Sequence, residues 1–219
     1  MPPAERIRTS WQRRPGSDYL FDFWSAFGWS VLTCGFYSYY VLFQLMRRAR
    51  DHNARRLEML EAARTYAWER ALGQGVADEL TPAFERVAAQ LAVLQQKASE
   101  FRDPALWLVL AILTGGIATY VAWILLDADL DTHDRAEVSI EAELAQIYAR
   151  LGVSIPTADP LRVKGRHNYV GRVVATIATC GVYGLFWLYD LMVEGNRHFE
   201  ANWAWEDDLA RAVQALEAA

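Results

Sequence analysis

The distribution of charged residues divides the chain into three apolar stretches separated by polar ones. Residues 23–46 and 104–126 contain no Asp, Glu, Lys or Arg, and residues 173–189 form a shorter stretch of the same kind. An α-helix rises ~1.5 Å per residue, so about 20 residues cross the ~30 Å hydrocarbon core of a membrane. The first two stretches reach that length, and the third does so if Arg172 and Asp190 extend toward the headgroups. The pattern predicts an all-α integral membrane protein with three membrane segments, in preference to a soluble bundle with three buried helices.

The first long polar stretch has the periodicity of an amphipathic helical hairpin. Gly73 and Gly75 are expected to break it, and the returning arm carries apolar residues at alternating spacings of four and three. This is the spacing of a coiled-coil seam, whose partner is either the outgoing helix or another subunit. The predicted interaction seam comprises Phe84, Val87, Leu91, Leu94 and Phe101, with Leu80 and Ala98 in the same register.

The same pattern predicts the remaining boundaries. In chain order we expect a polar N-terminal arm (1–22), membrane segment 1 (23–46), the helical hairpin (47–103), membrane segment 2 (104–126), an acidic edge with an amphipathic helix and loop (127–166), membrane segment 3 (167–193) and a C-terminal amphipathic helix (194–219). The arm is too polar, and the first apolar stretch too long, for a cleaved signal peptide. Tryptophans at 203 and 205 mark the last helix as a second candidate binding surface.

A short motif recurs in the middle of the apolar segments. Thr33-Cys34-Gly35-Phe36-Tyr37 in the first segment matches Thr179-Cys180-Gly181-Val182-Tyr183 in the third, and the second holds Thr114 and Gly116 with Ala118 in place of the tyrosine. Each copy is followed by a helix with polar residues, so the chain is interpreted as three descendants of one unit. The candidate helix-packing residues of this motif are Thr33, Gly35, Tyr37, Thr114, Gly116, Thr179, Gly181, Tyr183 and Trp187.

This motif carries a resemblance to a known family. Thr-x-Gly-x-Tyr inside an apolar segment, followed by Leu-x-x-Leu-Met, resembles the bacterial membrane family called domain of unknown function 4234. The third copy keeps the family's further tryptophan at Trp187, whereas the first copy has Val41 there. The resemblance implies a location in the bacterial cytoplasmic membrane and implies no activity.

The repeated glycine allows two interpretations. In the first, it is a notch that lets two membrane helices pack closely, with the threonine bonding a nearby carbonyl. In the second, the chain reverses at the glycine, and each segment becomes a re-entrant hairpin that enters and leaves on one side. Arg47, Arg48 and Arg50 place the end of segment 1 in the cytoplasm, and the positive charge elsewhere barely separates the two sides. We expect three spanning segments with the N-terminus outside, and hairpins are the alternative.

Two groups of polar residues follow the apolar segments. His52, His133 and His198 hold equivalent repeat positions, but three spanning segments would put His133 on the opposite side, so they are expected to be separate interfacial residues. Asp127, Asp129, Asp131 and Asp134 form an acidic group at a membrane edge. The first three have the spacing of the start of a calcium loop, but the required Gly and Glu are missing, so at most a weak divalent-cation site is expected. Asp190 and Glu194 are interpreted as edge charges that pair with Arg172 or Arg47.

The composition narrows the function. A net charge of −5 argues against a nucleic-acid partner. The sequence carries none of the catalytic or phosphate-binding motifs sought, and Cys34 and Cys180 lie inside apolar segments. We therefore expect no enzyme activity, no cofactor and no metal. The predicted function is a membrane scaffold or interaction subunit that binds the lipid bilayer and other membrane proteins or itself, and the alternative is a small channel or transporter.

Overall fold

The computed structural model describes residues 1–99, 103–157 and 162–218, which form helices and no strand. The all-α prediction is therefore confirmed for this part of the chain. The helices are α1 (Pro3–Ser17), α2 (Phe23–Leu32), α3 (Phe36–Gln74), α4 (Ala77–Ser99), α5 (Pro104–Leu113), α6 (Ile117–Arg150), α7 (Tyr169–Ala178) and α8 (Val182–Ala218).

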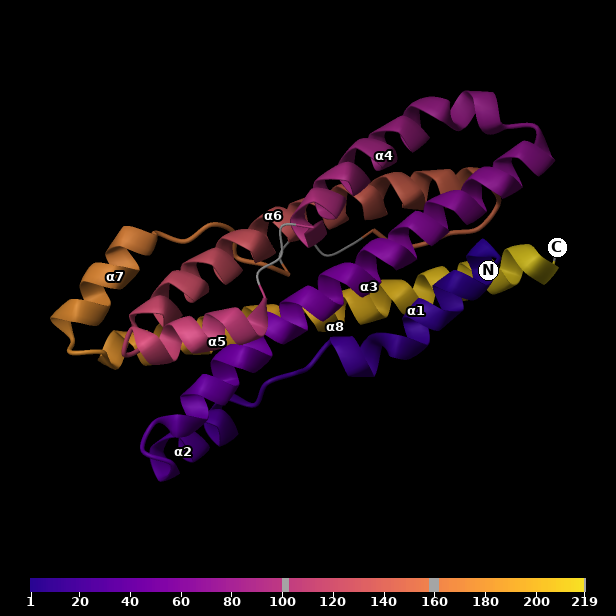
Figure 1. Cartoon of the computed structure of the whole chain (residues 1–219). Coiled ribbons are helices and arrows are strands. Elements are labelled where there is room, and N and C mark those ends of the chain that lie inside the picture. The colour runs from indigo at the N-terminus through magenta and orange to yellow at the C-terminus, as the bar shows by residue number, and fades with distance from the viewer. Residues whose placement is uncertain (100–102, 158–161, 219) are drawn as a thin grey trace.

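The three long helices α3, α6 and α8 form the body of an elongated bundle (Figure 1). Helix α4 packs against α3 and α6, and α1 packs against α3 and α8. The short helices α2, α5 and α7 gather at one end, where each connects to a long helix, and both chain termini lie at the opposite end (Figure 1).

Each expected membrane segment consists of two helices. Segment 1 divides into α2 and the start of α3, segment 2 into α5 and α6, and segment 3 into α7 and α8. No helix in the described part of the chain is both long and apolar enough to cross a membrane. The preferred prediction of three continuous spanning helices is thus wrong, because the chain reverses in the middle of each apolar segment, at the repeated motif.

The reversal has the same hydrogen-bond pattern in all three copies. The amides of Gly35, Gly116 and Gly181 donate to carbonyls five residues earlier, each at 2.8 Å, which closes the Schellman pattern of a helix end. These glycines have φ of 91°, 94° and 93°, and the residue before each is also left-handed, at Cys34, Gly115 and Cys180. A backbone with positive φ cannot continue a right-handed helix, so the short helix ends there.

The threonine of the motif links the two helices of each hairpin. Thr33 Oγ1 donates to the Trp29 carbonyl at 2.7 Å and accepts from the Tyr37 amide at 2.9 Å. One hydroxyl therefore satisfies a carbonyl at the end of α2 and an amide at the start of α3. Thr114 and Thr179 make the same pair of bonds in the other two hairpins.

The repeated glycines are not points of close contact between helices. A β-carbon built on Gly35, Gly116 or Gly181 meets no atom within 4 Å. The packing interpretation of these glycines is corrected accordingly: glycine is required by backbone conformation, because a side chain raises the energy of a left-handed residue.

The predicted seam lies inside the chain. Phe84, Val87, Leu91 and Leu94 on α4 are buried in the large apolar core that α4 shares with α3 and α6, whereas Phe101 lies outside the described residues. Trp68 on α3 packs edge-on against Phe84, with ring centroids 5.0 Å apart. The sequence left two partners open for this seam, the outgoing helix or another subunit. The seam packs against the outgoing helix α3, and also against α6, which the pattern did not indicate.

Replacing Gly35 with alanine should lower the free energy of unfolding by ~1–2 kcal/mol, because an L-residue is penalised in the left-handed conformation. Gly28 supplies a matched control, since it also has open space around its β-position but lies within helix α2. Gly28→Ala should be neutral or stabilising by up to ~1 kcal/mol. Denaturant unfolding of both variants checks this, and equal effects would contradict the turn role of Gly35.

Candidate functional site

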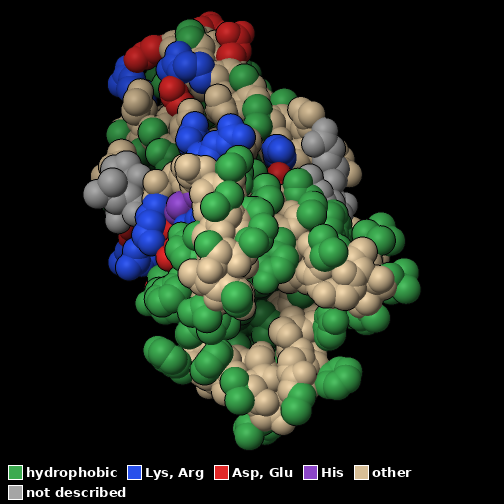
Figure 2. Space-filling model, turned by 90° about the vertical axis from the view of Figure 1, so that its left-hand side faces the viewer, with side chains coloured by type: hydrophobic (Ala, Val, Ile, Leu, Met, Phe, Trp, Pro, Cys, Tyr) green, Lys and Arg blue, Asp and Glu red, His purple; other side chains and the backbone are tan. Residues whose placement is uncertain are grey.

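The hairpin end of the bundle is an exposed apolar surface. Large hydrophobic side chains that are well exposed include Trp24, Leu32, Phe36, Leu113, Ile117 and Ile177. Outside the hairpins, the described residues add only Met1, Tyr19, Leu72 and Val93 to this class. Figure 2 views this end and shows apolar side chains gathered over it, with charged ones along the upper part. We call this surface the apolar end.

The three hairpins enclose a hollow at the apolar end. Its volume is about 690 Å³, and its walls include the turn residues Gly35, Gly116 and Gly181 together with Tyr39 and Trp123. Leu42, which is part of the wall, and the neighbouring core residues Met46 and Trp187 are almost fully buried. Trp187, the tryptophan of the motif, packs edge-on against Trp123 with ring centroids 5.7 Å apart. The hollow is thus closed on its inner side by an apolar core.

A layer of buried polar residues separates this core from the larger apolar core at the other end. Along α3 the order is Leu42 and Met46, then His52, Arg55 and Arg56, and then the large core. Helices α6 and α8 follow the same order, with polar residues between apolar ones. We call the buried polar residues that lie between the two apolar cores on α3, α6 and α8, with the side chains that pair with them, the polar layer. Burying so many ionisable groups is unfavourable unless they pair with one another.

Three histidines from the three long helices meet in the polar layer. His52, His133 and His198 are each at most 2% exposed. Their ring centroids lie 5.6, 5.1 and 5.7 Å apart, which makes a nearly regular triangle. They occupy equivalent positions of the repeat, so the prediction that His133 lies on the opposite side is wrong. Because each hairpin returns the chain to the side it came from, all three long helices bring their histidine to the same level.

Carboxylates orient two of these histidines. His52 Nδ1 lies 3.0 Å from Asp18 Oδ1, and His198 Nδ1 lies 2.9 Å from Asp134 Oδ1. Burial lowers the pKa of His52 to about 3 and also lowers the pKa of His198. Both rings are therefore neutral at physiological pH, with Nδ1–H donated to the carboxylate and Nε2 as an acceptor that faces the Asn202 amide nitrogen.

Glu137 lies beside all three rings. Its carboxylate oxygens are 3.2 Å from His133 Nε2 and 3.2 Å from His198 Nε2. Burial raises the pKa of Glu137, but the neighbouring His133 and Arg56 more than offset this, so its pKa lies well below the usual range. One nitrogen from each histidine and one oxygen of Glu137 lie within 4.8 Å of one another. This donor set could hold a metal ion.

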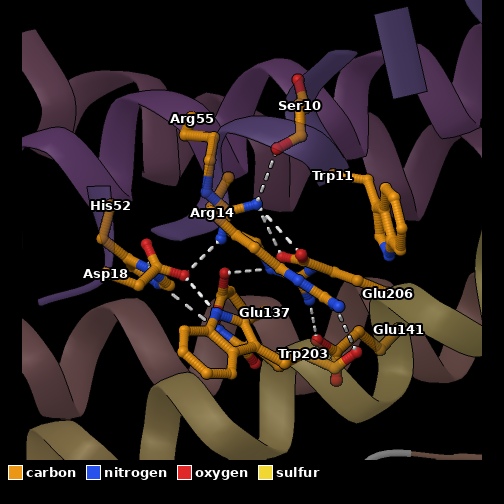
Figure 3. Close-up of polar contacts among 12 residues, drawn as sticks. Ser10, Trp11, Arg14, Asp18, His52, Arg55, Glu137, Glu141, Trp203 and Glu206 are labelled. Carbon is orange, nitrogen blue, oxygen red and sulfur yellow. Dashed lines mark hydrogen bonds and ion pairs between the residues drawn. The ribbon is translucent and has the colours of Figure 1, made fainter. Parts of the chain in front are cut away.

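Guanidinium groups surround the carboxylates of the polar layer. Arg55 bridges Asp18 and Glu206 at 2.7 and 2.9 Å (Figure 3). Arg56 contacts Glu137 at 2.7 Å and also binds Glu141 and Glu206. These arginines come from α3 and the glutamates from α6 and α8, so the network joins the three long helices.

Arg162 adds a further guanidinium from the segment between α6 and α7. It is buried and binds Asp134, Glu137 and Glu141 on α6 and the Asn202 side chain on α8. Its place in a loop with two prolines and a glycine gave no indication of this role. The network therefore extends beyond the helices that carry the repeat.

Arg48 lies at the edge of the polar layer nearest the apolar end. Its guanidinium donates to the carbonyls of Tyr19 and Leu191 and to the Asn196 side chain. A β-carbon at position 195 would overlap Arg48 Nη2, so Gly195 leaves the space that this side chain fills. Burial lowers the pKa of Arg48 to about 9.

A second group of ionisable residues lies nearer the apolar end. His167 Nδ1 is 3.0 Å from Asp127 Oδ2, and His167 Nε2 is 3.4 Å from Glu194 Oε1. Lys164 is also 3.5 Å from Glu194. The acidic residues expected to resemble a calcium loop thus lie on helix α6 and pair with separate partners. Asp190 binds Arg172 at 2.8 Å, which is one of the pairings anticipated for it.

The C-terminal tryptophans face the chain's own core. Trp205 is buried in the large apolar core, with the Arg56 guanidinium 4.8 Å from its ring centroid. Trp203 Nε1 donates to Asp18 Oδ2 at 2.7 Å. The expectation that this helix offers its tryptophans to a partner is corrected, because both are engaged within the chain.

Sequence reasoning found the histidines but not their convergence. It missed Glu137, Arg56 and Arg162, which look like solvated charges of amphipathic segments. One signal was available: Arg56, Glu137 and Asn202 are equivalent repeat positions, four residues after each histidine. Polar residues one helical turn apart in every copy lie on the same face as the histidines.

The comparisons give no relative for this chain. No family model, no curated protein and no solved structure matches it. The resemblance to domain of unknown function 4234 therefore stays a sequence-based prediction.

Arg56→Met should lower the free energy of unfolding by ~3–5 kcal/mol, because it leaves buried glutamates without their guanidinium partner. The control is Arg86→Met, which removes the exposed pair of Arg86 with Glu143 and should change stability little. Thermal unfolding of the two variants measures the difference. Similar small effects would mean that the buried network does not hold the long helices together.

Proposed function

We propose that this protein is a non-enzymatic membrane-anchored helical bundle, whose three hairpins insert into one face of a lipid bilayer. The observation that carries the proposal is the apolar end, where three chain reversals expose large hydrophobic side chains. The one charged residue of the three short helices, Arg172 in α7, is buried and pairs with Asp190. An apolar surface of this kind marks a membrane or protein contact. The insertion of hairpins from one side replaces the three spans expected from the sequence.

The dimensions of the hairpins support insertion to about half the bilayer. Each of α2, α5 and α7 has 10 residues. At ~1.5 Å per residue such a helix is ~15 Å long, about half of the ~30 Å hydrocarbon core. The charge-free part of α3 before Arg47 has a similar length. Each hairpin therefore matches one leaflet, and the polar layer remains on the side from which the hairpins enter.

The turns suit a lipid environment because they leave few backbone groups unsatisfied. The threonine hydroxyl and the Schellman bonds pair the carbonyls and amides that a chain reversal frees. In hydrocarbon an unpaired backbone group costs several kcal/mol, so this pairing lets a reversal lie inside the membrane. The bacterial cytoplasmic membrane is the proposed location, on the strength of the family resemblance alone.

A channel or transporter finds less support. The hollow at the apolar end and the polar layer are separated by Leu42, Met46 and Trp187, all nearly fully buried. Self-association or binding of other membrane proteins stays a prediction. The described residues of the seam proposed for it are buried within the chain, and Trp203 and Trp205 contact the chain's own residues.

Replacing Phe36, Ile117 and Val182 together with aspartate should weaken membrane binding at least ~100-fold. These exposed residues hold equivalent positions at the starts of α3, α6 and α8, where an acidic residue favours the helix, so the fold should persist. Burying each wild-type side chain contributes ~1.5–3 kcal/mol, and 1.4 kcal/mol is a tenfold change.

Flotation with phosphatidylcholine vesicles after detergent removal measures this binding. Leu72→Asp is the control, because Leu72 is exposed near the end of α3 far from the turns, and this variant should float like the wild type. Unchanged flotation of the triple variant, with its helicity intact, would rule out insertion through the apolar end.

A further inference from the structure

We infer that His52, His133, His198 and Glu137 form a binding site for one divalent transition-metal ion, with zinc as the best match to the donor set. The site lies in the polar layer and uses one histidine from each repeat. It is independent of membrane insertion, because none of these residues belongs to the apolar end.

The geometry provides three nitrogen donors and one oxygen donor around one point. The four ligand atoms lie within 4.8 Å of one another. Around a zinc ion with bonds of ~2.1 Å, neighbouring tetrahedral ligands are roughly 3.4 Å apart, so separations of up to 4.8 Å would have to contract by up to about 1.4 Å to complete the site. His133 Nε2 is already 3.2 Å from Glu137 Oε1, and His198 Nε2 is 3.2 Å from the other oxygen, Oε2. Three imidazoles with one carboxylate suit zinc and other late first-row divalent ions.

A purely structural network of ion pairs does not explain why His133 is buried. His133 is 2% exposed; its Nδ1 has no hydrogen-bond partner, and its Nε2 faces Glu137 Oε1 at 3.2 Å without the geometry of a hydrogen bond. An imidazole buried without hydrogen bonds costs free energy that a leucine of similar size would avoid. A metal ion bound through Nε2, beside Glu137, would supply the missing partner.

The other two histidines already have the outer contacts that metal ligands require. A histidine that binds metal through one nitrogen usually donates the other N–H to a carboxylate, which fixes the ring and its tautomer. Asp18 does this for His52 and Asp134 for His198, each through Nδ1. Their Nε2 atoms lie 3.4 and 3.2 Å from the Asn202 amide nitrogen, on the side where Glu137 lies.

The charge of the layer also fits a divalent ion. The carboxylates that contact its guanidinium or imidazole groups are Asp18, Asp134, Glu137, Glu141 and Glu206, and the guanidinium groups that pair with them are Arg55, Arg56 and Arg162. In their charged forms they leave an excess of two negative charges. Protonation is the competing way to balance them, since burial raises the pKa of Glu141 and of Glu206.

Zinc titration of the full-length protein tests the site. All samples carry Cys34→Ser and Cys180→Ser and an affinity tag without histidine, which removes other soft ligands. After treatment with a chelator and gel filtration, elemental analysis should find one zinc per chain when zinc is added back. His133→Ala should lose this equivalent or bind at least ~100-fold more weakly, and Asp18→Asn should bind ~10–100-fold more weakly.

His167→Gln is the matched control, since His167 is the one histidine outside the site and pairs with Asp127. It should keep the full equivalent. Binding of Co²⁺ to the wild type gives a second readout that needs no variant: a four-coordinate site yields strong visible absorption, whereas a surface-bound ion does not. No zinc bound by the wild type, zinc retained in a folded His133→Ala, or zinc lost only in His167→Gln would each overturn the assignment.

Discussion

The structure depends on one local constraint, the left-handed backbone at the glycine of the Thr-x-Gly motif. The constraint ends each short helix after 10 residues and reverses the direction of the chain. The threonine hydroxyl makes the reversal compatible with an apolar setting, because it pairs a carbonyl of one helix with an amide of the next. Because the chain reverses at each turn, the three long helices start at the same end of the bundle, run side by side and keep the register of the repeat (Figure 1).

That register converts a sequence repeat into a layered core. The same helical positions are apolar in the first turns of each long helix, then carry the histidines, then the residues Arg56, Glu137 and Asn202. The result is a polar layer between two apolar cores. Such a layer is unfavourable for stability compared with a wholly apolar core, because buried ions lose their hydration. A role of its own would explain why such a layer is kept, and the convergence of three imidazoles on one carboxylate is the basis for the proposed one.

The sequence was enough to predict the all-α class, the three apolar segments, the motif in each and the equivalence of His52, His133 and His198. It was not enough to choose between a span and a hairpin, because an apolar stretch such as 23–46 fits a full crossing as well as two half crossings. The choice between a span and a hairpin determines whether His52, His133 and His198 lie at the same level of the bundle. Glu137 and Arg162 could not be recognised as buried, since charged residues of amphipathic or loop segments usually face water and only tertiary pairing distinguishes them.

The proposed insertion requires the chain to keep this hairpin arrangement in a bilayer. Distances between paired spin labels test it most directly, with labels at Ala54 and Arg135, exposed residues close in sequence to His52 and His133. In lipid nanodiscs, with the native cysteines replaced, neighbouring helices ~10 Å apart should give a label separation of about 20–30 Å. Three spanning segments would place the two labels on opposite faces of a ~30 Å hydrocarbon core, and a separation beyond ~40 Å would contradict the account.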